Sequence, residues 1–360
     1  MVANSGGGVT ATASVLLGQG HGLFGAATSV NVGPSYIEGP SSLALADFNR
    51  DGHLDVAIAF SLPSEINVVF GDGLGAFTLP TAYSRQTGAP ANSVIAADFN
   101  HDGVADLAVA RAPSTIGVLF GKADGGFGVE VSFPSGPGPT SLRAADLNAD
   151  GHADLLFVNA SLATLADGGS RGWSTGVLLG LADAGFGPES AFEVGNHPVA
   201  LAVGDFNGDG RIDAATAHLV DSLTTDLTVS VMLGTGTGGL SSAQGFRGGP
   251  YALGLAAADF NADGKVDLAV THKINTPVTN SLTFSTLGLL LGAGTGAFGL
   301  PTWWSVGSQP LTPVVGDFNG DGLPDLAVVN YGYEAVFPDG GVNPAPPPAG
   351  SLSVLVGVCH

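Results

Sequence analysis

The sequence predicts an all-β protein assembled from repeated small sheets. Three observations support this: a nine-residue acidic phrase occurs six times, a Gly-rich phrase alternates with it, and short runs rich in Val, Leu and Ala lie between them. Runs of this kind, bounded by Gly, Asn, Asp and Pro, are strand signals. No window shows a convincing helical period, so we expect strands throughout.

The acidic phrase has the form DxNxDGxxD and recurs about every 54 residues. Self-similarity at such a period indicates a repeat architecture, in which each repeat is one supersecondary unit. The six copies span residues 47–55, 98–106, 146–154, 205–213, 259–267 and 317–325.

The Gly-rich phrase is an apolar run followed by a Gly turn and usually a Phe, as in VLFGKADGGF from Val118. Each repeat therefore reads as four strands: A enters the acidic phrase, B leaves it, C precedes the Gly turn and D follows the Phe. Copies start at Val15, Val68, Val118, Val177, Val231 and Leu289, and a shortened one starts at Val354.

Four strands per repeat of this length are typical of a β-propeller blade. A solenoid is the less suitable alternative, because its rungs are shorter and its ends need polar caps. The chain has room for 25 strands, whereas six four-stranded blades need 24 and seven need 28. We therefore expect six blades, with seven as the alternative.

The N-terminal strand D, near Phe24, is expected to complete the last blade, so that the termini close the ring and remove a sheet edge. One terminal strand, 10–17 or 351–358, is then spare and able to pair with another molecule. Residues 1–360 are expected to form one domain with repeat units at about 14–65, 66–115, 116–174, 175–228, 229–286 and 287–360.

The composition excludes several functions. With 10 Lys and Arg against 31 Asp and Glu, and a formal net charge of −21, the chain has no basic surface for nucleic acid or anionic membrane. No apolar stretch approaches the length of a membrane span, so we expect no membrane insertion. The single Cys359 allows no intrachain disulfide, and no secretory signal is visible.

The acidic phrase predicts a cation site. Oxygen-bearing side chains at positions 1, 3 and 5, a Gly that permits a sharp bend, and a closing carboxylate at position 9 are what a hard cation such as Ca²⁺ requires. An ordinary turn does not require three carboxylates within nine residues, and their mutual repulsion would destabilise it. The predicted ligands are Asp47, Asn49, Asp51, Asp55, Asp98, Asn100, Asp102, Asp106, Asp146, Asn148, Asp150, Asp154, Asp205, Asn207, Asp209, Asp213, Asp259, Asn261, Asp263, Asp267, Asp317, Asn319, Asp321 and Asp325.

The alternation of DFNxDGxxDLAV with VLLGxGxGxF resembles the FG-GAP/VCBS repeats of bacterial surface proteins and the calcium-binding blades of integrin alpha chains. The resemblance implies about six structural Ca²⁺ sites, in which position 7 ligates through its backbone carbonyl. The family includes adhesins, glycan-binding modules and accessory domains of enzymes, so it does not decide function. The residues at position 7 are His53, Val104, His152, Arg211, Lys265 and Leu323.

No catalytic constellation is visible, and we expect no enzyme. The sequence has no GxSxG, HExxH or P-loop phrase. His53, His101 and His152 lie inside acidic phrases, where solvated side chains are expected. A shared ligand site formed by His197, His218 and His272 is an alternative.

Aromatic residues and long insertions are the candidate ligand-binding features. Trp303 and Trp304 are adjacent in a predicted strand D, so at least one faces outward; the other candidates are Trp173, Tyr331 and Tyr333. Long loops on a rigid scaffold commonly carry recognition. The insertions, which all follow strand B, are 161–174, 220–228, 273–286 and 331–350.

The sequence therefore predicts a calcium-stabilised, extracellular or cell-surface binding module for a glycan or protein. A structural subunit of a surface assembly, joined through a spare terminal strand, is the alternative from another class. A polysaccharide-acting enzyme is the third.

Overall fold

The protein is described here from a computed structural model, in which every assigned element is a strand. The described residues are 2–4, 10–34, 40–62, 64–78, 84–86, 88–161, 163–164, 170–171, 173–182, 185–220, 227–272, 286–307, 309–330 and 351–356.

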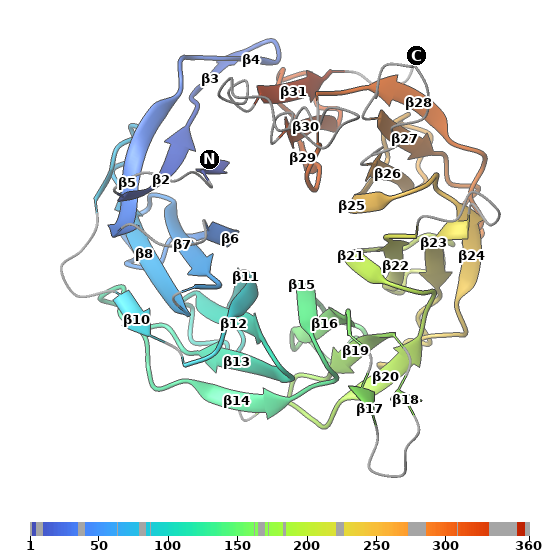
Figure 1. Cartoon of the computed structure of the whole chain (residues 1–360), viewed down its shortest axis with the longest axis horizontal. Coiled ribbons are helices and arrows are strands. Elements are labelled where there is room, and N and C mark those ends of the chain that lie inside the picture. The colour runs from blue at the N-terminus through green and yellow to red at the C-terminus, as the bar shows by residue number, and fades with distance from the viewer. Residues whose placement is uncertain are drawn as a thin grey trace, which may run out of the picture. The chain divides into compact units, whose positions relative to one another are not determined.

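Six antiparallel sheets follow one another along the chain, and each contains one acidic phrase between its first two strands (Figure 1). We call them blades 1 to 6. Blade 1 comprises β6 (Pro40–Ala46), β7 (Asp55–Phe60), β8 (Glu65–Gly71), β9 (Phe77–Thr78) and β10 (Ser84–Gln86); blade 2 comprises β11 (Ala91–Ala97), β12 (Asp106–Arg111), β13 (Thr115–Leu119) and β14 (Val131–Pro134); blade 3 comprises β15 (Pro139–Ala145), β16 (Asp154–Asn159), β19 (Ser174–Leu178) and β20 (Ser190–Glu193).

The second half of the chain repeats the pattern. Blade 4 comprises β21 (Pro198–Gly204), β22 (Asp213–His218), β23 (Leu227–Met232) and β24 (Gln244–Arg247); blade 5 comprises β25 (Ala252–Ala258), β26 (Asp267–His272), β27 (Thr286–Leu290) and β28 (Thr302–Ser305); blade 6 comprises β29 (Val314–Gly316), β30 (Asp325–Asn330) and β31 (Ser351–Leu355). A small hairpin of β17 (Ala163–Thr164) and β18 (Ser170–Arg171) lies between β16 and β19 in sequence. The predicted all-β fold, a six-bladed β-propeller, is confirmed.

The chain divides into two compact units. The first comprises Met1–Gly18, Phe24–Glu193 and Thr235–Gly239, and the second comprises Gln19–Leu23, Val194–Gly234 and Leu240–His360. Blades 1 to 3 belong to the first unit and blades 4 to 6, apart from the turn 235–239, to the second.

The N-terminal strands pair differently from what the sequence predicts. β2 (Thr10–Val15) and β5 (Thr28–Pro34) pair with each other and with β1 (Val2–Asn4) in a separate sheet, which has no acidic phrase. The strand after Phe24 therefore does not become the fourth strand of blade 6, and β2 and β31 are both paired rather than spare. Only residues 16–27 separate β2 from β5, so their local pairing costs less loop entropy than pairing with a distant strand.

The turn between β3 (Gly18–Gly20) and β4 (Leu23–Phe24) belongs to the second unit and contacts blade 6, where the Gly22 N–H donates to the Phe318 carbonyl at 3.1 Å. A Cβ at Gly22 would collide with Val356, as one at Gly75 would collide with Leu17. The N-terminal hairpin therefore contacts blade 6 in the same way as the Gly turn of blade 1 contacts the N-terminal sheet.

Aromatic edge-to-face contacts join neighbouring blades. In the first unit, the Phe186 ring after the Gly turn of blade 3 lies 5.7 Å from Phe99 and 5.2 Å from Phe133, both in blade 2. In the second unit, Phe298 of blade 5 lies 5.6 Å from both Phe206 and Phe246 of blade 4. The Phe that ends the Gly-rich phrase therefore packs against the preceding blade.

We predict that Phe186→Ala lowers the free energy of unfolding by about 3–4 kcal/mol, because it leaves a cavity among buried rings. Phe77→Ala is the matched control, since Phe77 occupies the same place in blade 1 but has no ring contact among the described residues. Urea unfolding measures both; a Phe77→Ala variant as unstable as Phe186→Ala would contradict the role given to the aromatic contacts.

Candidate metal centres in the acidic loops

Each acidic loop is a tight turn held by its own side chains. In the loop 98–106, Asp98 Oδ1 accepts from the Asp102 N–H at 3.2 Å, and Asp98 Oδ2 accepts from the Gly103 N–H at 2.9 Å. Asn100 Oδ1 accepts from the same Asp102 N–H at 3.0 Å. All six loops repeat these bonds. Gly103 has φ 79°, a conformation that favours Gly.

The carboxylate at position 9 is different because it is fully buried in every loop. Asp106 Oδ2 accepts from the Phe99 N–H at 2.9 Å, and Asp106 Oδ1 accepts from the Gly121 N–H at 2.7 Å. The first bond recurs in all six loops, and the second in blades 1 to 5. This carboxylate therefore ties the start of the acidic loop to the end of strand C.

The Gly after strand C is required by the same contact. A Cβ at Gly121 would collide with the backbone carbonyl of Ala105, and a Cβ at Gly234 with that of Ile212. Only Gly brings its N–H to the buried carboxylate without this clash, which explains the first Gly of the Gly-rich phrase.

Burial and repulsion act together on these carboxylates. Burial and, to a smaller extent, the negative charges of Asp102 and Asp98 raise the pKa of Asp106 to about 6, although the N–H groups of Gly121 and Phe99 act to lower it. At position 5, by contrast, the backbone N–H of His53 lowers the pKa of Asp51. Three carboxylates close enough to repel therefore share one loop, and a cation would offset that repulsion.

The donor chemistry fits a hard cation, because each loop offers carboxylate and amide oxygens and no soft ligand. In the described part of the chain, however, no group of three or more His, Cys, Asp or Glu side chains is already arranged to hold an ion. Side chains at positions 1, 3 and 5 accept bonds from the turn's own N–H groups, so ligation would exchange some of these bonds for bonds to the ion.

Position 7 has no common side-chain environment. Val104 is buried, whereas His53, Arg211 and Lys265 are exposed. The backbone is what these residues share: the Val104 N–H donates to Asp102 Oδ1 at 2.8 Å, and the other five loops have the equivalent bond. A role for position 7 through its main chain is consistent with this variety.

The His residues do not form a shared site in the described structure. His218 and His272 are each fully buried in their own blades. His218 Nε2 lies 2.9 Å from Ser230 Oγ, and the His272 ring lies 5.1 Å from Trp303. His197, the third candidate, is exposed.

A feature that sequence reasoning missed is the last residue of each strand B, which is polar and buried in blades 2 to 6. Two of these side chains bond to the residue just before strand D of their own blade: Arg111 pairs with Glu130 at 2.8 Å, and Asn159 Nδ2 donates to Glu189 Oε1 at 2.8 Å. The sequence does contain a signal for this feature, because a polar residue ends the apolar strand B in each of these five repeats. The residues are Arg111, Asn159, His218, His272 and Asn330.

The aromatic residues proposed for ligand binding lie in different parts of the chain and differ in exposure. Trp303 is 46% exposed, and Trp304 packs toward the core opposite Leu287, as alternation along a strand requires. Trp173 is half-buried, and Tyr331 and Tyr333 lie outside the described residues. About half of the insertion 161–174 also lies outside them, as do most or all of 220–228, 273–286 and 331–350.

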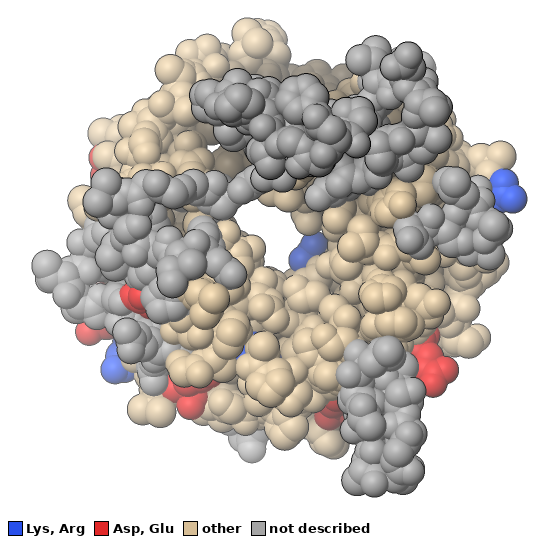
Figure 2. Space-filling model, in the orientation of Figure 1, with Lys and Arg blue, Asp and Glu red and all other residues tan. Residues whose placement is uncertain are grey.

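The surface carries no concentrated charge on the side that Figure 2 draws, where Lys and Arg of the described residues do not gather into a patch. In the described part of the chain, no helix is long and apolar enough to cross a membrane.

We predict that Asp106→Ala in EDTA lowers the free energy of unfolding by about 3 kcal/mol, because two buried N–H groups lose their acceptor. Asp102→Ala is the matched control, since Asp102 is exposed and bonds only within the turn. Denaturant unfolding compares the two, and equal losses would contradict the structural role of position 9.

We also predict acid sensitivity from the buried imidazoles. Burial lowers the pKa of His218 and of His272 to about 4, below the usual 6.5. The unfolded chain then binds more protons between pH 6.5 and 4, so stability falls as the pH falls through this range, by about 3 kcal/mol for each His. His218→Gln should flatten the pH dependence of unfolding over this range, and an unchanged slope would contradict the assignment.

Comparisons with known proteins agree with this architecture. The model of the FG-GAP-like repeat matches residues 47–109, 105–157 and 205–270, and that of the FG-GAP repeat matches 310–355. A crystal structure of a protein from Lactobacillus plantarum superposes with a TM-score of 0.57 at 15% identity, covering 96% of this chain and 99% of that one; at this identity it shows the fold alone. No curated protein matched. The matched repeats contain all six acidic loops and cover more than half of the sequence, and the chain belongs to the FG-GAP repeat family.

Proposed function

We propose that this protein is a calcium-stabilised, extracellular or cell-surface binding module that recognises a glycan or a protein. FG-GAP repeat propellers are typically non-catalytic binding modules, which supports binding over catalysis. The observation that carries the calcium part is the recurrence of one loop geometry six times, each time with three carboxylates and an amide within nine residues.

Electrostatics supports a structural role for the ion. Eighteen of the 31 acidic residues lie in the six loops, which accounts for much of the net charge of −21. If each site binds with a dissociation constant on the order of 10⁻⁴ M, as extracellular calcium modules do, millimolar calcium contributes roughly 1–2 kcal/mol per site. Six such sites together are comparable with the net stability of a domain.

Ligand recognition is proposed for exposed aromatic side chains. Trp303 projects from β28, the outer strand of blade 5, with its ring against His272 and above Gly288. A rigid indole supported from below can stack on a sugar ring or anchor a protein contact. Trp173 is the second described candidate.

We predict that EDTA lowers the melting temperature substantially and that added Ca²⁺ restores it, because removing the ions leaves the carboxylates uncompensated. Differential scanning calorimetry measures the shift, and added Mg²⁺ is the control, since its strict octahedral demand suits these loops less well. A melt that EDTA does not move would refute structural calcium.

We predict that Trp303→Ala abolishes glycan or protein binding without lowering the melting temperature by more than a few degrees. Wild type and variant are applied to a glycan array and to a surface-protein panel, each with calcium and with EDTA. Trp304→Phe serves as the control because Trp304 packs inward. Retained binding by Trp303→Ala would remove this residue from the recognition surface.

A second candidate, a subunit of a surface assembly, is favoured by the outer edge of blade 6. Leu352 and Val354 of β31 are half-exposed, whereas the residues at the same two places in the other five blades are buried, among them Ile116 and Val118. No fourth strand covers β31 among the described residues. An added strand from another molecule would complete this sheet.

Size-exclusion chromatography with light scattering at several concentrations tests this second candidate. Assembly predicts a mass that rises with concentration and that Val354→Pro reduces, because Pro removes a ladder donor at the edge. A constant monomer mass would exclude it.

A further inference from the structure

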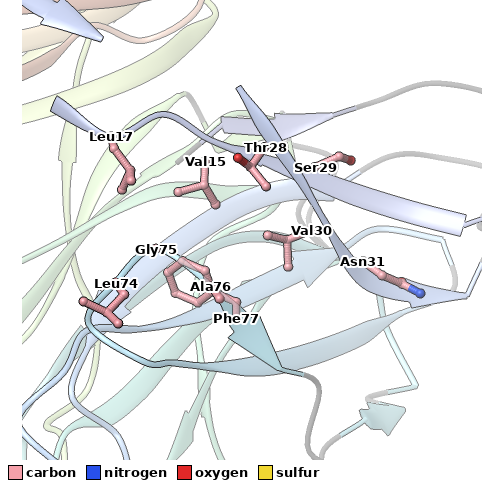
Figure 3. A pocket seen from close by; sticks show the side chains of 10 residues that line it. All are labelled: Val15, Leu17, Thr28, Ser29, Val30, Asn31, Leu74, Gly75, Ala76 and Phe77. Carbon is pink, nitrogen blue, oxygen red and sulfur yellow. The ribbon is translucent and has the colours of Figure 1, made fainter. Parts of the chain in front are cut away.

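A groove of about 580 Å³ lies between the N-terminal sheet and the Gly turn of blade 1, within the first unit. Figure 3 shows Val15, Leu17 and Val30 on one side and Leu74 and the Phe77 ring on the other. Its size is within the range of small-molecule sites, and its walls are mainly apolar. Leu74 is 82% exposed at the rim, although it is a large aliphatic side chain.

The internal repeats explain why there is space here. In blades 2 to 5, the third residue of strand D is aromatic. It pairs across the sheet with the strand C residue that lies five positions before the Gly after strand C. The pairs are Phe133 with Ile116, Phe192 with Thr175, Phe246 with Val229, and Trp304 with Leu287. The N-terminal sheet has the same register, but there Val30 pairs with Ala13. Both members of this pair are smaller than an aromatic ring; Ala13 is fully buried, and Val30 lines the groove.

The ring on the opposite wall, Phe77, lacks the partner ring that its equivalents have in other blades. In blade 3, Phe186 packs edge-to-face on Phe133, the strand D ring of the blade before it, and Phe298 packs in the same way on Phe246. Phe77 is the equivalent Phe of blade 1, and the sheet before it presents Val30 instead of a ring. Phe77 has no ring contact within the described part of the chain. One aromatic partner is therefore absent from a contact that the molecule makes elsewhere.

We propose that this groove is a binding site for a small molecule with a planar aromatic ring. The ring takes the position that Phe133 occupies beside Phe186, with its edge or face against Phe77 and its other sides against Val15 and Val30. Edge-to-face aromatic contacts add to simple area burial, so a planar ring is preferred over a saturated ring of similar size. The exposed Leu17 and Leu74 extend the apolar wall toward the rim.

The hydroxyl groups of Thr28 and Ser29 border the groove and are exposed. A polar substituent on the ring can therefore remain hydrated or bond to these hydroxyls while the ring itself is buried. The site is independent of the acidic loops and of Trp303, so its existence does not rest on the function proposed above.

Indole is the probe that tests the proposal, with cyclohexanol as the saturated control. The full chain in millimolar calcium is titrated with each compound, and binding is followed by protein-detected NMR. We expect saturable indole binding with one site per chain and at least tenfold weaker binding of cyclohexanol. Shifts should be greatest for residues of β2, β5 and the turn that includes Gly75.

Two variants decide the location. Val30→Phe places the missing ring in the groove, and it should weaken indole binding at least tenfold while keeping or raising the melting temperature. Phe133→Val opens the equivalent space beside Phe186 and should raise the stoichiometry from one indole to two; Phe246→Val is the same test in the second unit, should Phe133→Val fail to fold.

The proposal is overturned by any of three results: no saturable indole binding to wild type, indole binding that persists in Val30→Phe, or equal binding of cyclohexanol. A folded Phe133→Val or Phe246→Val variant that still binds only one indole would also overturn it, because the missing ring would then not define the site.

Discussion

The buried carboxylate that closes each acidic loop is the interaction on which the rest of the structure depends. In blades 1 to 5 its two oxygens accept from the N–H at the start of the loop and from the N–H of the Gly after strand C, as Asp106 does with Phe99 and Gly121. Strands A, B and C are thereby fixed at one end by one side chain. The Gly turn that follows is positioned by this bond, and the Phe that ends the turn then reaches the rings of the preceding blade.

The loop carboxylates at positions 1 and 5 have a different role. In blades 2 to 5 burial raises the pKa of the ninth carboxylate, and the carboxylates at positions 1 and 5 raise it as well, so charges of one sign lie near a buried group of the same sign. Hydrogen bonds within the turn offset part of this repulsion. A bound divalent ion would offset more, which links the proposed calcium to the stability of the same strands that the ninth carboxylate holds.

Most of the fold could be predicted from the sequence because the same contacts recur in each repeat. The acidic loops, the four strands of each complete blade and the inward and outward Trp pair at 303 and 304 all follow from repetition and alternation. The N-terminal sheet could not be predicted in the same way: whether β5 joins blade 6 or β2 depends on local against distant pairing, which a repeat pattern does not encode. The groove beside Phe77 was missed for a related reason, since it arises where Val30 departs from the pattern and only the register of β2 with β5 reveals what is missing. The buried polar residues that end strand B in blades 2 to 6 are hard to recognise from the sequence, because Arg, Asn and His occupy the same position without sharing a residue type.

The most direct test of the account is an anomalous difference map from crystals of the full chain grown in millimolar calcium. The account predicts six peaks, one in each acidic loop, each with oxygen ligands at about 2.3–2.6 Å from the side chains at positions 1, 3 and 5. Loops that show no peak, with these side chains bonded only to the backbone of their own turns, would contradict it.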